Sequence, residues 1–151
     1  MIFISSSPKT SSSTFERIAS EVAEIAQTSI TKVTETRPLT ILRANNILDF
    51  ASKLDLDNEY ERMVVIILSD ISNEIILREK MKSLKIEGSP LDAGIPNKIK
   101  TIKEKGQDVY KKEEIKQVRE LRNGIVHSGN IPDKNQAKKA LEVAIDVLKN
   151  A

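Results

Sequence analysis

The longest helical pattern in the sequence runs from about Glu59 to Leu84, and the rest of the chain must pack around it. Its apolar residues recur at helical spacing over several turns: Met63, Ile66, Ile67, Ile71, Ile75, Leu77, Met81 and Leu84. Between Val64 and Leu68 the pattern is apolar nearly all round, which is typical of a helix covered on several sides. We therefore expect this segment to form the central, buried helix of a helical protein.

Helical spacing also recurs on both sides of this segment. It predicts a first helix over 14–36, a second from about Thr40 to Leu54, a short one over 97–105, a long one starting near Lys111, and a last one after Asp133. Only 3% of the residues are aromatic, so the core must be built from Ile, Leu, Val and Ala, as is typical of helix bundles. The predicted fold is all-α, an up-and-down bundle of four long helices plus one short helix.

Polar residues mark where several of these helices begin and end. Ser13 with Glu16, Asn58 with Glu61, and Asp133 with Gln136 have the spacing of capping boxes. Gly106 is expected to end the short helix, and Gly129, Asn130 and Pro132 the long one that precedes the last helix.

A chain of 151 residues predicts one domain. Residues 1–13 are rich in Ser and Thr and lack periodicity, so we expect a flexible N-terminal arm followed by a single helical domain over 14–151. The narrow apolar stripe of 14–36 could pack against a neighbouring helix of the same chain or form a dimer seam.

Several classes of site are excluded or disfavoured by composition. Cysteine is absent, which excludes disulfides, thiolate metal sites and cysteine nucleophiles. A single histidine makes a poor metal-ligand set, and the sequence has no glycine-rich phosphate loop, so we expect neither a metal nor a cofactor.

The apolar start Met1–Ile4 is too short for a secretory signal. The longest aliphatic run, Val64–Leu68, is far shorter than the roughly 20 residues of a membrane span. We expect a cytoplasmic protein without membrane contact.

The chemistry of the chain is concentrated between Arg119 and Gly129, which hold two arginines, an asparagine, two glycines and the only histidine. On an ideal helix Arg122 falls within the apolar arc, where a guanidinium needs a partner. Asp70 and Glu74 share one face of the central helix and are the expected partners. The alternative is that Arg122 reaches water along its aliphatic stem.

The residues after Arg122 lie on the other side of this helix. Asn123 and His127 are four residues apart, so the amide could orient the imidazole. His127 could instead sit at the helix C-terminus only because a cation is favoured there. Gly124 could admit a substrate or a second backbone, or simply allow close helix packing. Arg122 and His127 lie about 140° apart on an ideal helix. Either the helix loosens at Gly124, or His127 lies past its end, or a second subunit completes the site.

The run Arg122-Asn123-Gly124-Ile125-Val126-His127 resembles the signature of the HEPN superfamily, an Arg followed after four to six residues by His, late in a helix of an all-α bundle. The resemblance implies metal-independent cleavage of RNA by a homodimer whose two Arg–His pairs line one composite cleft. In the implied reaction a ribose 2′-hydroxyl attacks the adjacent phosphate, and one product ends in a 2′,3′-cyclic phosphate. In this reading Arg122, His127 and Asn123 are catalytic, with Asp70, Glu74 and Arg119 in support.

The segment leading to this motif is basic, with nine Lys or Arg against five Asp or Glu between Asn97 and Arg122. A phosphate-bearing partner favours such a segment. The residues expected to contact the RNA backbone are Lys103, Lys105, Lys111, Lys112 and Lys116. For any one of them alone, a solvated surface lysine is the competing interpretation.

The resemblance admits a toxin or phage-defence role, with an antitoxin or regulatory protein as a further partner. A toxin branch of the family carries a modifiable Tyr two residues after the His, where this chain has Gly129, so neutralisation by that route is not expected here. One alternative function is a non-catalytic HEPN-like module that binds nucleotide or protein. Another is a helical interaction module that uses 14–36 as its seam.

Overall fold

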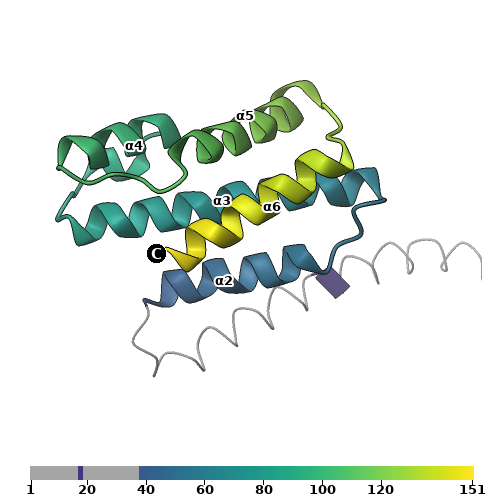
Figure 1. Ribbon diagram of the computed structural model, residues 1–151, viewed down its shortest axis with the longest axis horizontal. Coiled ribbons are helices and arrows are strands. Elements are labelled where there is room, and N and C mark those ends of the chain that lie inside the picture. Colours follow the sequence, from purple (N-terminus) through teal and green to yellow (C-terminus); the bar gives the residue numbers. More distant parts are fainter. Residues whose placement is uncertain (1–16, 19–37) are drawn as a thin grey trace, which may run out of the picture.

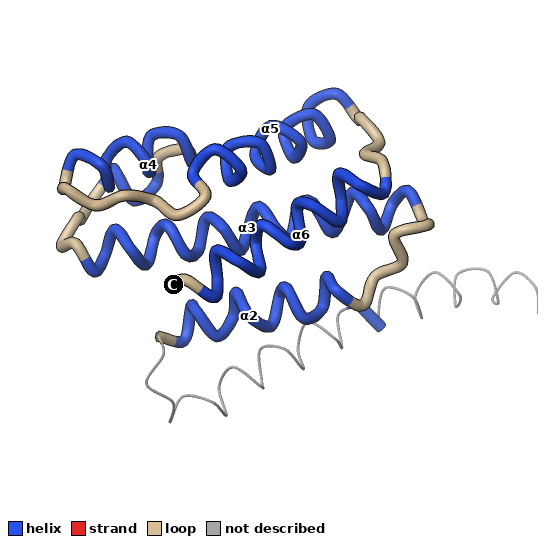
Figure 2. The backbone as a smooth tube through the Cα atoms, viewed as in Figure 1, coloured by secondary structure: helices blue, strands red, loops and turns tan. Residues whose placement is uncertain are grey.

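The computed structural model describes residues 17–18 and 38–151, and these residues contain helices and loops but no strand (Figures 1 and 2). The helices are α2 (Leu39–Ser52), α3 (Glu59–Ser83), the short 3-10 helix η2 (Ser89–Asp92), α4 (Ile95–Glu104), α5 (Lys112–Ser128) and α6 (Lys134–Lys149). The predicted all-α bundle is thus confirmed over this part of the chain, where α2, α3, α5 and α6 are long and α4 is short; the predicted segment 14–36 would be a fifth long helix, one more than the predicted bundle counts. Arg17 and Ile18 are helical, but the rest of the predicted helix 14–36, its capping box and the predicted arm 1–13 lie outside the described residues.

Helix α3 occupies the centre of the described bundle and contacts α2, α4, α5 and α6 (Figure 1). The ion pair between Lys134 and Asp57, at 2.8 Å, places the start of α6 beside the start of α3. The ion pair between Lys111 and Asp146, at 2.7 Å, places the start of α5 beside the end of α6. Helices α3 and α6 therefore run in the same direction, and α5 runs opposite to both.

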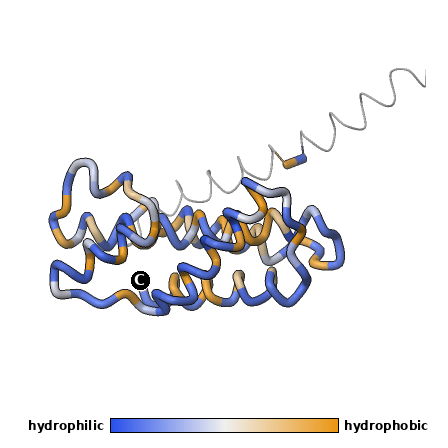
Figure 3. The backbone as a smooth tube through the Cα atoms, turned by 90° about the horizontal axis from the view of Figure 1, so that it is seen from above, coloured by the Kyte–Doolittle hydropathy of each residue, from blue (hydrophilic) through white to orange (hydrophobic). Residues whose placement is uncertain are grey.

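The core is aliphatic, as the composition predicted. Hydrophobic and hydrophilic residues alternate along each helix in Figure 3, and the buried ones form one cluster dominated by Ile, Leu, Val and Ala. Burial of α3 is not complete all round, however. Val65 and Ile66 are buried, whereas Tyr60, Val64 and Ile71 expose a large part of their side chains along one side of the helix. This open side adjoins Asp70, which directly precedes Ile71.

The predicted helix ends agree with the structure in most details. The capping box of α6 is complete: the Gln136 backbone N–H donates to Asp133 at 2.7 Å, and the Asp133 N–H donates to the Gln136 side chain at 2.9 Å. Asn58 caps α3 by accepting from the backbone N–H groups of Tyr60 and Glu61. Its own N–H donates to a backbone carbonyl, that of Asp55, so Glu61 does not complete that box. Gly106 and Gly129 follow α4 and α5 with positive φ angles, as a helix stop requires.

None of the helices in residues 17–18 and 38–151 combines the length and the apolar character needed to cross a membrane.

Two buried polar side chains on α3 make no hydrogen bond. The Ser72 hydroxyl and both polar atoms of the Asn73 amide are enclosed without a partner in the described part of the chain. A buried amide of this kind costs about 1–3 kcal/mol of stability, whereas an apolar side chain of similar shape does not.

We predict that Asn73→Leu raises the free energy of unfolding by about 1 kcal/mol or more, because it removes the unpaired amide and keeps nearly the same volume. Urea denaturation monitored by circular dichroism measures the change. Asn97→Leu, at an exposed position of α4, is the matched control and should shift stability by less than about 0.5 kcal/mol. A loss of stability in Asn73→Leu would mean that the amide has a partner in solution.

Candidate functional site

Helix α5 carries the sequence motif and remains α-helical along its whole length, Lys112–Ser128. It starts with Glu113 and Glu114 in its first turn, where acids are favoured by the helix dipole. It ends at Gly129, with φ of 65°, where the Asn130 N–H donates to the Gly124 carbonyl at 3.1 Å. Two of the three explanations for the separation of Arg122 and His127 are therefore wrong. The helix does not loosen at Gly124, and His127 lies within its last turn.

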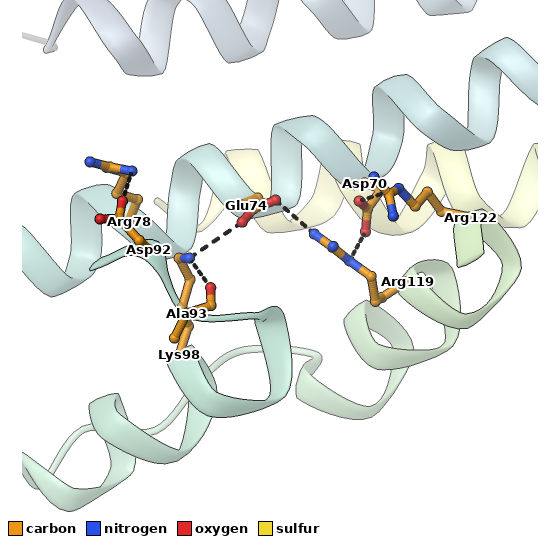
Figure 4. A network of polar contacts seen from close by, with 8 residues as sticks. All are labelled: Asp70, Glu74, Arg78, Asp92, Ala93, Lys98, Arg119 and Arg122. Atoms are coloured by element: carbon orange, nitrogen blue, oxygen red, sulfur yellow. Dashed lines mark hydrogen bonds and ion pairs between the residues drawn. The ribbon is translucent and has the colours of Figure 1, made fainter. Parts of the chain in front are cut away.

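Asp70 and Glu74 of α3 are held by an arginine of α5, and that arginine is Arg119. Its Nε donates to Asp70 Oδ1 at 2.9 Å and its Nη2 to Glu74 Oε2 at 2.7 Å (Figure 4). The Arg119 side chain is only 17% exposed and the Asp70 side chain 3%. Asp70 and Glu74 were expected to pair with Arg122, so this prediction placed them correctly on the face towards α5 but assigned most of the pairing to the wrong arginine.

Arg122 lies at the edge of the network that Asp70, Glu74 and Arg119 form. Its Nε lies 3.9 Å from Asp70 Oδ2, a weak ion pair, and its Nη1 donates to Asn123 Oδ1 at 3.0 Å. The side chain is 32% exposed. Figure 4 shows Asp70 between the two guanidinium groups, with Arg122 on the outer side. Arg122 is thus neither fully buried in an ion pair nor free in solvent: it is oriented by two neighbours and still accessible to a ligand.

Lys98 extends the network to α4, and sequence reasoning missed it. Its Nζ donates to Glu74 Oε1 at 3.3 Å and to the Ala93 carbonyl, and its side chain is 1% exposed. A signal was present in the sequence. Lys98 lies three residues after Ile95 and four before Ile102, on the apolar face of the short helix, where a lysine must be paired.

The two acids differ in their electrostatic environment. Burial raises the pKa of Asp70, and the nearby charge of Arg119 only partly opposes this effect. Burial also acts to raise the pKa of Glu74, but hydrogen bonds and charges from Arg119 and Lys98 outweigh it, so that this pKa is lowered. Glu74 is therefore the carboxylate that is most firmly held in its ionised form, and Asp70 is the one closer to neutralisation.

The lowered pKa of Glu74 predicts a pH-dependent contribution to stability. A carboxyl group whose pKa is lower in the folded than in the unfolded state stabilises the fold above its unfolded value, and this stabilisation is lost as the pH falls through the folded value. Wild-type protein should therefore lose stability below about pH 4.5, and Glu74→Gln should lack that part of the loss. Urea denaturation from pH 7 to pH 3 measures both proteins. Parallel curves for the two would contradict the assignment.

His127 lies apart from this network. It is exposed, and among the described residues it makes no hydrogen bond or ion pair. The expected pairing with Asn123 is not formed, because the Asn123 carbonyl oxygen accepts from Arg122 instead. An unbroken helix keeps Arg122 and His127 about 140° apart around its axis, so one copy of α5 presents them on different sides.

Gly124 is not required by close helix packing. The three heavy atoms nearest to a Cβ atom built there all belong to the Asn130 side chain, with the amide nitrogen at 2.9 Å. That nitrogen is the end of a side chain that can rotate away, so the closest contact above Gly124 is with a movable group.

We predict that Gly124→Ala raises the free energy of unfolding, by up to about 1 kcal/mol, since alanine favours the helix and Asn130 can move. Thermal and urea denaturation measure the effect. A loss of more than about 1 kcal/mol would show that the position of Asn130 over Gly124 is itself stabilising.

The lysines that were expected to bind RNA differ in their surroundings. Lys111 pairs with Asp146, while Lys112 and Lys116 lie near acids at 3.5 Å and 3.6 Å. Lys103 and Lys105 are exposed at the end of α4.

Within the described residues no three His, Cys, Asp or Glu side chains are grouped so that they could hold a metal ion. Comparison of the chain with protein-family models, curated proteins and solved structures finds no match.

Proposed function

We propose that this chain is a metal-independent endoribonuclease of the HEPN type that acts as a homodimer. The observation that carries the proposal is the state of Arg122. It is accessible, its guanidinium is oriented by Asn123 and Asp70, and Asp70 is itself held by Arg119, which also donates to Glu74. A planar cation that is oriented and still open to solvent suits the non-bridging oxygens of a phosphodiester.

The proposed chemistry uses two residues of α5. One His127 accepts the proton of a ribose 2′-hydroxyl while its oxygen attacks the adjacent phosphorus. The bond to the 5′ oxygen breaks, and this oxygen takes a proton from a second His127. Arg122 stabilises the negative charge that builds up on the phosphoryl oxygens. The products are a 2′,3′-cyclic phosphate and a 5′-hydroxyl.

A dimer is part of the proposal because a single chain contains one histidine, while the reaction uses an acid and a base. The exposed apolar side chains beside the network support a second copy at this face. Ile71 directly follows Asp70 and is 40% exposed, and Val126, one turn after Arg122, is 51% exposed. We propose that this face meets its counterpart in the partner, so that the two copies supply Arg122 and His127 to one cleft.

An RNA nuclease inside a cell must be restrained until it is needed. We therefore propose a toxin or phage-defence setting, with an antitoxin or regulatory protein as the second partner. A cytoplasmic location belongs to the same proposal, since that is where the RNA substrate is.

A second candidate function is a non-catalytic HEPN-like module that binds nucleotide or protein. The observation that favours it is His127, which has no neighbour among the described residues to fix its tautomer. Incubation of the purified protein with single-stranded RNA in EDTA separates the two functions. The nuclease cleaves the RNA and leaves a DNA of the same sequence intact, whereas the binding module changes neither.

A further inference from the structure

A groove runs between α5 and α6 on the side of α5 that faces away from the acid network. It consists of two adjoining hollows, of about 520 Å³ and 350 Å³, that share Leu121 and Gln136. Leu121 lies about 160° around an ideal helix from Arg119, so the groove and the network use different faces of α5. No residue assigned to RNA cleavage above lines either hollow.

The floor of the groove is apolar. Val118 and Leu121 of α5 face Ala140 and Val143 of α6, and Ile125 continues the floor into the second hollow. From Glu114 to Ile125 the groove follows about 16 Å of helix, or three turns. It ends at Ile131, whose side chain is 53% exposed. An apolar channel of this length between two helices fits the apolar stripe of a third helix.

The rim of the groove is acidic. Glu114, Glu120 and Asp133 line it against a single cation, Lys139. Within the described part of the chain, neither Glu114 nor Glu120 has an ion-pair partner within 4.0 Å. The chain as a whole has a formal net charge of +2, so this rim contrasts with the rest of the protein.

We propose that the groove docks an amphipathic helix of a partner protein whose apolar stripe is flanked by Lys or Arg. The alternative occupant is the segment 14–36 of this chain, from the same copy or a second one. The net charges of the two occupants distinguish between them. That segment has two Lys or Arg against four Asp or Glu, and its net negative charge would meet an acidic rim. A helix with basic flanks places cations beside Glu114 and Glu120.

Two synthetic helical peptides of about 15 residues test the proposal. Both carry Leu at positions i, i+4, i+7 and i+11, and they differ only in having Lys or Glu beside this stripe. Fluorescence anisotropy gives the affinity for the full-length protein, and amide chemical shifts locate the contact. The Lys-flanked peptide should bind at least about tenfold more tightly than the Glu-flanked one, as two or three exposed ion pairs would provide. The shifts should fall on Leu121, Gln136 and Val143.

The double variant Glu114→Lys with Glu120→Lys should reverse this preference. Circular dichroism checks that the fold is retained, because Glu114→Lys removes one of the two acids from the first turn of α5. Glu87→Lys with Glu104→Lys is the matched control, because both acids are exposed away from the groove, and it should retain the preference. Equal affinity for the two peptides, or shifts on another face, would overturn the proposal. Self-association of the protein through the groove, abolished by the rim variant, would overturn it as well, since the occupant would then be a second copy.

Discussion

Replacing His127 by alanine is expected to lower the rate of RNA cleavage by a factor of about 10² to 10⁴, the usual contribution of a general acid or base. The variant should lose activity and keep its stability, because His127 is exposed and has no hydrogen bond to another described residue. Stability should therefore change by less than about 0.5 kcal/mol. Initial rates on a fluorogenic RNA, measured in EDTA beside a urea denaturation curve, give both quantities.

Arg122→Ala should reduce the rate by about 10² to 10³, the typical loss when one group that stabilises transition-state charge is removed. Arg122→Lys should recover little of the rate, because lysine keeps the charge but not the planar fork. Arg78→Ala is the matched control. Arg78 is also an arginine ion-paired to an acid, Asp92 at 3.1 Å, but both side chains are exposed and they lie away from Asp70 and Arg119 (Figure 4). If either His127→Ala or Arg122→Ala cleaves RNA as fast as the Arg78→Ala control, the residue in question is not catalytic.

Arg119→Ala should have the largest effect on stability, a loss of about 3 kcal/mol in the free energy of unfolding. Among the described residues, Arg119 is the one side chain that joins both Asp70 and Glu74 to α5, and its removal leaves the buried Asp70 with only the 3.9 Å contact to Arg122. The loss should be smaller at acidic pH. Burial already raises the pKa of Asp70, and without Arg119 this carboxyl group can take up a proton at a higher pH and avoid a buried charge.

Urea denaturation of Arg119→Ala at pH 7 and pH 5 measures this effect. The double variant Arg119→Met with Asp70→Leu should regain much of the stability at pH 7, because it removes the charge together with its partner. A loss below about 1 kcal/mol in Arg119→Ala would mean that the network contributes little to the fold and cannot serve as a rigid support for Arg122.

The helices of the described region could be predicted from the sequence because their signals are local. Apolar spacing and glycine stops placed α3 and α5 to within a residue or two, and the capping residues of α6 placed its start. The assignment of the ion pairs failed because it depends on how α5 is shifted along α3. Arg119 and Arg122 are three residues apart and both face α3, so their positions around an ideal helix do not decide which of them reaches Asp70 and Glu74.

The contacts of single side chains were harder to predict from the sequence than the helices. The pairing of Asn123 with His127 was sterically reasonable, but Arg122 offers the same amide a charged donor, and charged hydrogen bonds are stronger. Lys98 was overlooked because a lysine in a basic segment suggests a solvated side chain. Its burial follows from the contact of α4 with α3, which brings it to Glu74.

The central claim, cleavage by transesterification that needs Arg122 and His127 but no metal, is tested most directly by the ends of the RNA products. The wild-type protein in EDTA should produce 2′,3′-cyclic phosphate and 5′-hydroxyl ends, identified by mass spectrometry. A substrate with a 2′-deoxyribose at the cleaved position should remain intact there. Products with 3′-hydroxyl and 5′-phosphate ends, or cleavage of the deoxy-substituted position, would contradict the account.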